Sequence, residues 1–376
     1  MMRTVDEHAD TVQPRPEITR LPRYRPGKPV ISRPGLEGFK LSSNESPFDP
    51  LPAVQEAIRL ADRPNVYPDA SASPLREKLA EMLRVRPSNI VAGTGSLAVL
   101  NDVLQVFAGR RPDGTADEVV HAWRSFESYP ISIGQTGARG VPVALRPDMT
   151  HDLEGMLAAV TEWTRVMILC TPNNPTGPAL GHAEVKDFLL RLPTHVLVVI
   201  DEAYVEYVRG EDRLDAMALH REFANVLVLR TFSKAHGLAG LRVGYAIATE
   251  RVIQHLEAVA VPFSVSQAGQ MAAIASLDAL PDVLERVDRT VQEREWFRTE
   301  LSSAGLCIPE AQGNFVWLPW GERSAEFTAL CNARAVAVRQ FAAEGVRVSI
   351  GLREAHLRVL EIVRCLLYTS PSPRDS

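Results

Sequence analysis

The feature that most constrains this sequence is a repeated alternation of short apolar segments with helical segments between residues 89 and 248. Two of the apolar segments, residues 166–170 and 196–200, have the near-continuous apolar character of strands buried on both faces of a sheet. The other predicted strands are residues 89–92, 118–123, 226–229 and 243–248. Strands that alternate with helices usually form parallel sheets covered by those helices. The sequence therefore predicts an α/β fold with a mostly parallel central sheet.

The pattern changes near residue 279, where a long, charge-rich amphipathic helix is predicted to begin. Short predicted strands at residues 315–318, 335–339 and 346–350 follow, with a helix between them, which is typical of a smaller α+β domain. We therefore expect a large domain (62–275), a small domain (36–61 and 276–364) and an N-terminal arm (1–35). The last twelve residues, 365–376, form an atypical tail, because the helix predicted near residues 357–363 is cut off. A truncated or frame-shifted end is the simplest interpretation, and a native tail is the alternative.

Charge and composition exclude several classes of function. The net charge of −5 gives no electrostatic basis for binding nucleic acid. The four cysteines are widely scattered and have no metal-site spacing, so we expect no metal and reduced thiols in a cytoplasmic protein. The N-terminus lacks the apolar core of a secretory signal. The uncharged run 258–277 contains Pro262 and several polar residues, so it predicts a buried turn and helix, not a membrane span.

Lys234 is an unusual residue in this chain. Only five of the 41 basic residues are lysines, and Lys234 follows Ser233 and precedes three closely spaced glycines. A lysine amine is the side chain that readily forms an imine with a carbonyl group. The plain alternative is a solvated loop lysine.

Polar residues follow several of the predicted strands. Ser96 begins a helix after Gly93-Thr94-Gly95, Asn174 lies in the rigid turn TPNNPTG, and Asp201 ends an apolar strand. Because parallel strands end at one edge of a sheet, these residues and Lys234 can converge in space. A helix N-terminus after small residues can bind phosphate, although an ordinary capped turn is the alternative for Ser96. Turn chemistry alone could explain Asn174, and a helix cap could explain Asp201.

Other candidate residues are less specific on sequence grounds. Phe126 follows a strand, where it could stack on a planar ligand or close the core, and Tyr67 lies in a turn beside a proline. Asn44 lies in a polar loop, where an Asx-turn is the alternative to ligand binding. Arg339 and Arg347 lie in or beside the last predicted strands and offer bidentate donors for a carboxylate, although surface arginines are common.

Taken together, these motifs resemble the fold-type I, pyridoxal-phosphate-dependent aminotransferases of class I/II. The resemblance extends from about residue 26 to residue 362, and its centre is SKAHGLAGLRVGY (233–245). Supporting motifs occur in the order of the family: YPDA, a Gly-Ser helix start, PNNPTG, DEAY and RVSIG. One departure is that Leu97 and Ala98 stand where many relatives have acidic residues.

The resemblance implies a role for each candidate residue. Lys234 would hold pyridoxal 5'-phosphate through an imine and then act as the base at the substrate Cα, and Asp201 would pair with the pyridine nitrogen. Asn174 and Tyr204 would hydrogen-bond the phenolic oxygen, and Phe126 would stack on the ring. The phosphate would be held by Ser96, the backbone of Leu97, Ser233, Arg242, and Tyr67 of the partner subunit, which implies a homodimer. Arg347 would hold the substrate carboxylate, with Arg339 and Asn44 completing the substrate site.

Within this class, the chain is most similar to histidinol-phosphate aminotransferases and to the aromatic aminotransferases of the same subgroup. The motifs that indicate this are LSSNESPFDPLP, WRSFESYP, VPFSVSQAGQMAA and VAVRQFAAEGVRVSIG. Arg339 as a second cation favours histidinol phosphate with 2-oxoglutarate, giving imidazole-acetol phosphate and glutamate in histidine biosynthesis. The alternatives are an aromatic amino acid aminotransferase for phenylalanine or tyrosine, and an amino acid decarboxylase of the same fold. A cofactor-binding regulator without catalysis is a further alternative, but the chain has no basic stretch for DNA.

Overall fold

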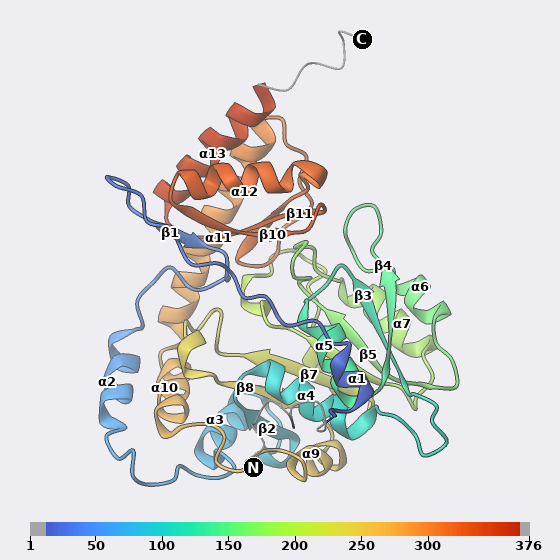
Figure 1. Cartoon of the computed structure of the whole chain (residues 1–376). Coiled ribbons are helices and arrows are strands. Elements are labelled where there is room, and N and C mark those ends of the chain that lie inside the picture. The colour runs from blue at the N-terminus through green and yellow to red at the C-terminus, as the bar shows by residue number, and fades with distance from the viewer. Residues whose placement is uncertain (1–12, 369–376) are drawn as a thin grey trace, which may run out of the picture.

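Two β-sheets organise residues 13–368, the part of the chain that this computed structural model describes (Figure 1). The larger sheet has seven strands in the order β2-β8-β7-β6-β5-β3-β4. Their bounds are β2 Ile90–Gly93, β3 Glu118–Trp123, β4 Arg139–Ala144, β5 Thr164–Cys170, β6 Leu197–Asp201, β7 Val226–Thr231 and β8 Gly244–Ile247. The pairs β3–β4, β3–β5, β5–β6 and β6–β7 are parallel, and β8 is antiparallel to both of its neighbours. The mostly parallel central sheet predicted from the sequence is therefore confirmed.

Two features of the large sheet differ from the expectation. The strand β8 is antiparallel to β7. The Lys234 loop that joins them contains only the short 3-10 helix Ala239–Leu241, whereas a parallel strand would need a longer crossover connection, usually a helix. The strand β4 was not predicted. Its sequence contains Arg139, Gly140 and Pro142 and its side chains are only partly buried, because it lies at the edge of the sheet.

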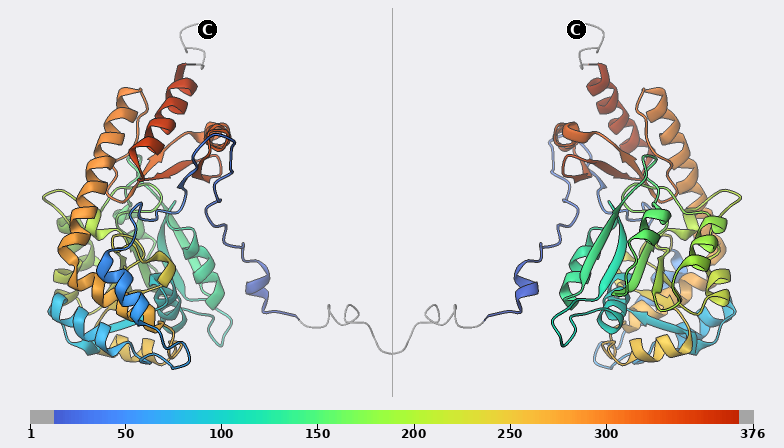
Figure 2. Two further views of the ribbon diagram at one scale, coloured as in Figure 1. Left: turned by 90° about the vertical axis from the view of Figure 1, so that its left-hand side faces the viewer. Right: turned by 90° about the vertical axis from the view of Figure 1, so that its right-hand side faces the viewer.

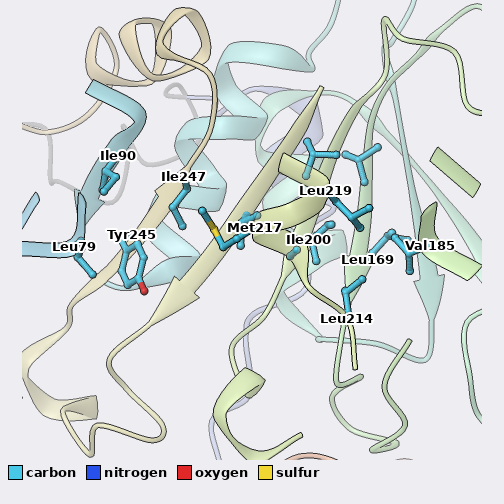
Figure 3. Close-up of a cluster of buried hydrophobic side chains, with 14 of the residues drawn as sticks. Leu79, Ile90, Leu169, Val185, Ile200, Leu214, Met217, Leu219, Tyr245 and Ile247 are labelled. Carbon is cyan, nitrogen blue, oxygen red and sulfur yellow. The ribbon is translucent and has the colours of Figure 1, made fainter. Parts of the chain in front are cut away.

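Helices cover both faces of the seven-stranded sheet. One face packs against α4 (Ser96–Phe107), α5 (Ser128–Thr136) and α9 (Glu250–Glu257). The other face packs against α3 (Ser73–Leu83), α6 (Leu153–Ala158), α7 (His182–Arg191), α8 (Ala216–Glu222) and α10 (Gln267–Asp278). Figure 3 shows part of this second core, in which Ile200 and Ile247 of the sheet lie near Met217 and Leu219 of α8. Because helices cover both faces of the sheet, the side chains on both sides of its central strands are buried, and these strands are therefore apolar throughout.

The second sheet has four strands in the order β1-β10-β11-β9 and lies above the first in Figure 1. Its strands are β1 Phe39–Leu41, β9 Phe315–Leu318, β10 Val336–Phe341 and β11 Gly345–Ser349, close to the predicted segments. It packs against α11 (Leu280–Ser303), α12 (Ser324–Ala333) and α13 (Arg353–Tyr368) around a separate core. Strand β1 pairs in parallel with β10, so the sheet joins chain segments about 300 residues apart. The helix α2 (Pro52–Leu60) follows β1 and contacts α10, which packs against the large sheet. The exact limits of the two domains stay a prediction.

The N-terminal arm is partly regular. A short helix, α1 (Pro16–Thr19), lies against α5, where Arg15 donates to the Gln135 carbonyl and Glu17 pairs with Arg110. From there a strap (residues 20–31) without helix or strand runs along the outside of the molecule to the small sheet (Figure 2). The predicted irregular lead-in is therefore interrupted by one helical turn, and residues 1–12 lie outside the described part.

Two other local predictions need correction. The segment 258–277 does contain a helix, α10, but the preceding turn is not buried, because Val261 is 70% exposed and Phe263 is 42% exposed. The C-terminal helix α13 does not stop after residue 363 but continues to Tyr368, because Leu366 is buried in the small-sheet core. Residues 369–376 of the predicted tail lie outside the described part. Within residues 13–368, no helix is both long enough and apolar enough to span a membrane.

Candidate functional site

A cavity of about 350 Å³ lies at the edge of the large sheet where its parallel strands end. This is the edge at which open α/β sheets bind ligands, and the volume is within the ~300–1,000 Å³ of typical small-molecule sites. The lining includes most of the predicted residues: Ser96, Leu97, Phe126, Asn174, Asp201, Tyr204, Ser233, Lys234, Arg242, Arg339 and Arg347. Asn44 and Tyr67 are not part of this lining.

Lys234 lies in the loop between β7 and β8 and lines the cavity. Its Nζ donates hydrogen bonds to the carbonyl oxygens of Ser43 and Asn44, both at 3.2 Å. Burial, together with the positive charges of Arg347 and Arg242, lowers the pKa of Lys234 to about 7, against the opposing effect of Glu45. Half of the Lys234 side chains are therefore neutral near pH 7, and a neutral amine can react as a nucleophile.

Asp201 is a buried carboxylate at the end of β6 with one oxygen satisfied. Its Oδ2 accepts a 2.7 Å hydrogen bond from the Tyr129 hydroxyl, whereas its buried Oδ1 has no hydrogen-bond partner among residues 13–368. Burial raises the pKa of Asp201 to about 6, although the Tyr129 hydrogen bond limits the increase. The alternative role as a helix cap is not observed, because the next helical turn, Val205–Tyr207, has Tyr204 at its N-cap. The free Oδ1 can accept from a cationic donor in the cavity.

The N-terminus of α4 forms an anion-binding corner with the loop before β8. Within residues 13–368, no side chain caps the first turn of α4, so its backbone N–H groups can bind a ligand. Because β8 is antiparallel, it begins at the edge where the other strands end, and this brings Arg242 to the corner. Arg242 donates to the Ser233 hydroxyl at 3.2 Å and to the Ala239 carbonyl at 2.9 Å. One guanidinium, one hydroxyl and a helix N-terminus therefore surround one position suited to a phosphate.

Two glycines allow this corner to close. A Cβ at Gly244 would lie 2.2 Å from the backbone nitrogen of Ser96, and a Cβ at Gly95 would lie 2.4 Å from Nη2 of Arg242. Gly95 also has φ +90°, which side chains rarely adopt. The β8 strand can pack against the start of α4 only because both positions lack a side chain.

Asn44 is a buried residue that hydrogen-bonds a side chain of the cavity wall. Its Nδ2 donates to the Tyr204 hydroxyl at 3.0 Å, and its Oδ1 accepts from the Ser349 hydroxyl at 2.9 Å. The side chain is buried and held by other side chains, so the Asx-turn alternative is not observed. Asn44 therefore positions the Tyr204 hydroxyl and is not among the residues that line the cavity, and its role in substrate binding stays a prediction.

Arg339 and Arg347 occupy paired positions on β10 and β11 but have different partners. The buried Arg347 donates to Asn174 Oδ1 and to the Ser42 carbonyl, and its Nε has no partner among the described residues. Arg339 forms an ion pair with Glu127 at 2.5 Å and donates to the Pro26 carbonyl at 2.8 Å. Both arginines line the cavity, and within the described residues Arg339 forms an ion pair with a carboxylate whereas Arg347 does not.

Several residues of the site were not assigned a role from the sequence. Tyr129 lies on α5, and its bond to Asp201 joins positions 72 residues apart. Glu127, Tyr24 and Phe341 also line the cavity. Phe341 could have been found from the period of a strand, because residues two apart, such as Arg339 and Phe341, point to one face. No local signal identifies Glu127 or Tyr24.

Tyr67 lies on the surface, away from the cavity of its own chain. Its side chain is 80% exposed and packs against Phe263 with tilted rings, whose centroids are 4.8 Å apart. Val66 and Val261 are also exposed nearby in the chain, so apolar side chains gather on two neighbouring loops.

Comparisons with known proteins give consistent matches. A family model described as "Aminotransferase class I and II" matches residues 37–361. The chain is 48% identical over 354 residues to an aromatic amino acid aminotransferase of Streptomyces avermitilis, covering 93% of this chain and 97% of that protein. It is similar to the crystal structure of a histidinol-phosphate aminotransferase from Sinorhizobium meliloti in complex with pyridoxal-5'-phosphate (TM-score 0.78, 28% identity, 87% of this chain, 91% of that chain). A histidinol-phosphate aminotransferase of Clostridium acetobutylicum shares the fold (TM-score 0.79, 19% identity, 88% and 100% coverage).

Proposed function

Because the chain belongs to the class I and II aminotransferases, we propose that it transfers amino groups between aromatic amino acids and a 2-oxo acid. The family match confirms the predicted fold-type I architecture and the class of enzyme, and enzymes of this family depend on pyridoxal phosphate. The sequence motifs alone favour histidinol phosphate as the donor. The relative with 48% identity is named an aromatic amino acid aminotransferase, and this supports phenylalanine or tyrosine instead.

The charges of the cavity also support an aromatic donor. Arg347 has no carboxylate partner among the described residues, so it can take the single carboxylate of an amino acid. Arg339 is already paired with Glu127, so the second cation is compensated before a substrate arrives. Phe126, Phe341 and Tyr24 add aromatic surface to the cavity. This asymmetry between the two arginines is the observation on which the substrate proposal rests.

The residues of the cavity fit pyridoxal phosphate as the cofactor. The uncapped start of α4, with Ser233 and Arg242, suits a phosphate group, and the unpaired Oδ1 of Asp201 suits a protonated ring nitrogen. Lys234 has a pKa of about 7 and can therefore bond to a carbonyl carbon at neutral pH. When bound, pyridoxal phosphate supplies an electron sink that stabilises negative charge at the substrate Cα.

Each side chain then has a defined task in the proposed reaction. Arg347 binds the substrate carboxylate and fixes the orientation of the Cα–H bond. Lys234 Nζ takes the proton from Cα and returns it during transfer, as a general base and acid whose pKa lies near neutrality. Asp201 retains positive charge at the ring nitrogen, and Tyr129 orients the Asp201 carboxylate. Asn174 and Tyr204 donate toward the phenolic oxygen, and Phe126 covers the ring.

A homodimer is part of the proposal. The exposed apolar group of Val66, Tyr67, Val261 and Phe263 is a surface that a second copy of this chain can bury. Tyr67 would then reach the phosphate site of the partner subunit, as the family resemblance implies. This would explain why the side chain is exposed within a single chain and absent from its own cavity.

Substrate preference can be measured in a single half-reaction. The cofactor-loaded enzyme is mixed separately with phenylalanine, tyrosine, histidinol phosphate and aspartate, and the loss of the cofactor's visible absorbance band is followed. We expect phenylalanine and tyrosine to react with a kcat/KM at least about tenfold above that of histidinol phosphate, because the second cation is compensated. Faster reaction of histidinol phosphate would contradict the substrate proposal, and release of CO2 without any requirement for a 2-oxo acid would indicate a decarboxylase.

The pKa of Lys234 predicts how the cofactor-free protein takes up pyridoxal phosphate. Only the neutral amine attacks a carbonyl, and its fraction rises with pH, reaching one half near pH 7. An unshifted lysine with a pKa of 10.5 would be only ~0.03% neutral at that pH. Stopped-flow absorbance from pH 5.5 to 9 should therefore give a rate of covalent uptake that rises with a midpoint near pH 7 and then levels. A rate that still rises tenfold per unit at pH 9 would contradict this lowered pKa.

A further inference from the structure

We propose that Glu127 determines which substrates the far end of the cavity accepts. By pairing with Arg339, it compensates the second cation and disfavours ligands with two anionic groups, and it must release Arg339 when a dicarboxylic 2-oxo acid binds. The inference rests on the proposed function, because it refines the substrate class of the same cavity. Glu127 is therefore a specificity-determining residue and not a participant in proton transfer.

The pair is built into the wall of the cavity. Both residues line it, with the Arg339 side chain only 11% exposed and the Glu127 side chain 30% exposed. Arg339 is held from three sides: by Glu127, by the Pro26 carbonyl of the strap, and by the Phe341 ring, whose centroid is 5.5 Å from its guanidinium carbon. The arginine is thus fixed in position, and the charge at its end of the cavity is close to neutral.

Arg347 provides the internal contrast. Its guanidinium lies 5.8 Å from the centroid of the same Phe341 ring, so the two cations flank one aromatic side chain. The acceptors of Arg347 are an amide oxygen and a carbonyl, both neutral. An entering carboxylate therefore meets, at Arg347, a cation that is not paired with a carboxylate among residues 13–368. At Arg339, the entering carboxylate meets a cation that is already paired with Glu127. The negative charges of the ligand and of Glu127 repel each other, and this repulsion opposes binding.

Glu127 is placed so that it can release Arg339. It is the residue directly before α5, and its carboxylate has no other hydrogen bond or ion pair within residues 13–368. The partly exposed side chain can therefore turn toward solvent without breaking a second contact. Arg339 is more buried and keeps its bond to the Pro26 carbonyl, so the carboxylate is the mobile member of the pair.

A nearby pair gives a matched control. Arg124, three residues before Glu127, pairs with Glu344, three residues after Phe341. Neither Arg124 nor Glu344 lines the cavity. The substitution Glu344→Gln therefore removes a similar carboxylate from an arginine beside the site without changing the charge of the cavity wall.

The test measures the binding of two unreactive ligands to the cofactor-loaded enzyme by isothermal titration calorimetry. Glutarate carries two carboxylates, and 3-phenylpropionate carries one carboxylate and an aromatic ring. In Glu127→Gln, we expect glutarate to bind about tenfold more tightly and 3-phenylpropionate to change by less than about twofold. Glu344→Gln should leave both affinities unchanged. The double variant Glu127→Gln/Arg339→Gln should lose the gain for glutarate.

The outcomes separate this inference from the proposed function. Unchanged or weaker glutarate binding in Glu127→Gln would overturn the role of Glu127, and so would an equal change for both ligands. Turnover of phenylalanine by the unchanged enzyme is measured separately. Its absence would overturn the proposed function, whereas the calorimetric comparison would still decide whether Glu127 controls the charge of the cavity.

Discussion

Replacing Lys234 with alanine is expected to reduce transamination of phenylalanine by at least about 1,000-fold. Lys234 is the cavity residue with an amine whose pKa, about 7, suits both covalent attachment and proton transfer. Its removal deletes the group that moves the Cα proton as well as the covalent bond to the cofactor. The measurement is kcat/KM for phenylalanine with saturating 2-oxoglutarate, together with the mass of the protein after borohydride reduction. The unchanged enzyme should carry one cofactor mass on the peptide containing Lys234, and the variant should carry none.

Lys186→Ala is the matched control for this substitution. Lys186 lies on α7 at the surface, where it pairs with Glu222. Its removal should leave the rate and the reduced adduct unchanged, because an exposed ion pair contributes only about 0–1 kcal/mol to stability. Near-normal turnover by Lys234→Ala, with folding verified by thermal denaturation, would disprove the assigned base.

Replacing Asp201 with asparagine is expected to lower kcat/KM by roughly 100- to 1,000-fold. The change keeps the shape and an oxygen for the Tyr129 hydroxyl, but it removes the negative charge that is proposed to face the ring nitrogen. A loss of this size corresponds to about 2.7–4.1 kcal/mol, which overlaps the ~3–5 kcal/mol that removing one partner of a buried ion pair costs. Tyr129→Phe should have a smaller effect of roughly tenfold, because it deletes one hydrogen bond to the carboxylate and leaves the charge in place.

Two measurements distinguish this electrostatic role from a structural one. The first is the fraction of cofactor lost on dialysis, which should be highest for Asp201→Asn and intermediate for Tyr129→Phe. The second is the pH at which the visible band of the bound cofactor changes, which should move in both variants. Asp288→Asn, which alters an exposed partner of Arg209, should move neither. A variant at Asp201 with normal cofactor retention and an unmoved spectral transition would contradict the assignment.

The larger elements could be predicted because their signals are local. Residues 118–123 were predicted as a strand with the bounds of β3, and the long charged helix matches α11, because burial on one or both faces leaves a periodic pattern in the chain. The edge strand β4 was missed, since half-exposed positions with Gly and Pro lack that pattern. The exposed turn at Val261 and Phe263 was mistaken for a buried one, because an exposed apolar side chain has the same sequence signal as one in a core.

The sequence by itself determined the α/β fold, the family, and the candidate positions at the strand ends, of which Ser96, Asn174, Asp201 and Lys234 line one cavity. These follow from periodicity and motif order, which are properties of neighbouring residues. The hydrogen-bond and ion-pair partners of the site residues became known only from the tertiary structure. It joins Tyr129 to Asp201, places Asn44 behind Tyr204, and pairs Glu127 with Arg339 across 212 positions of sequence. Hydrogen bonds and ion pairs act over a few ångströms in space, so these contacts depend on chain packing that no local pattern encodes.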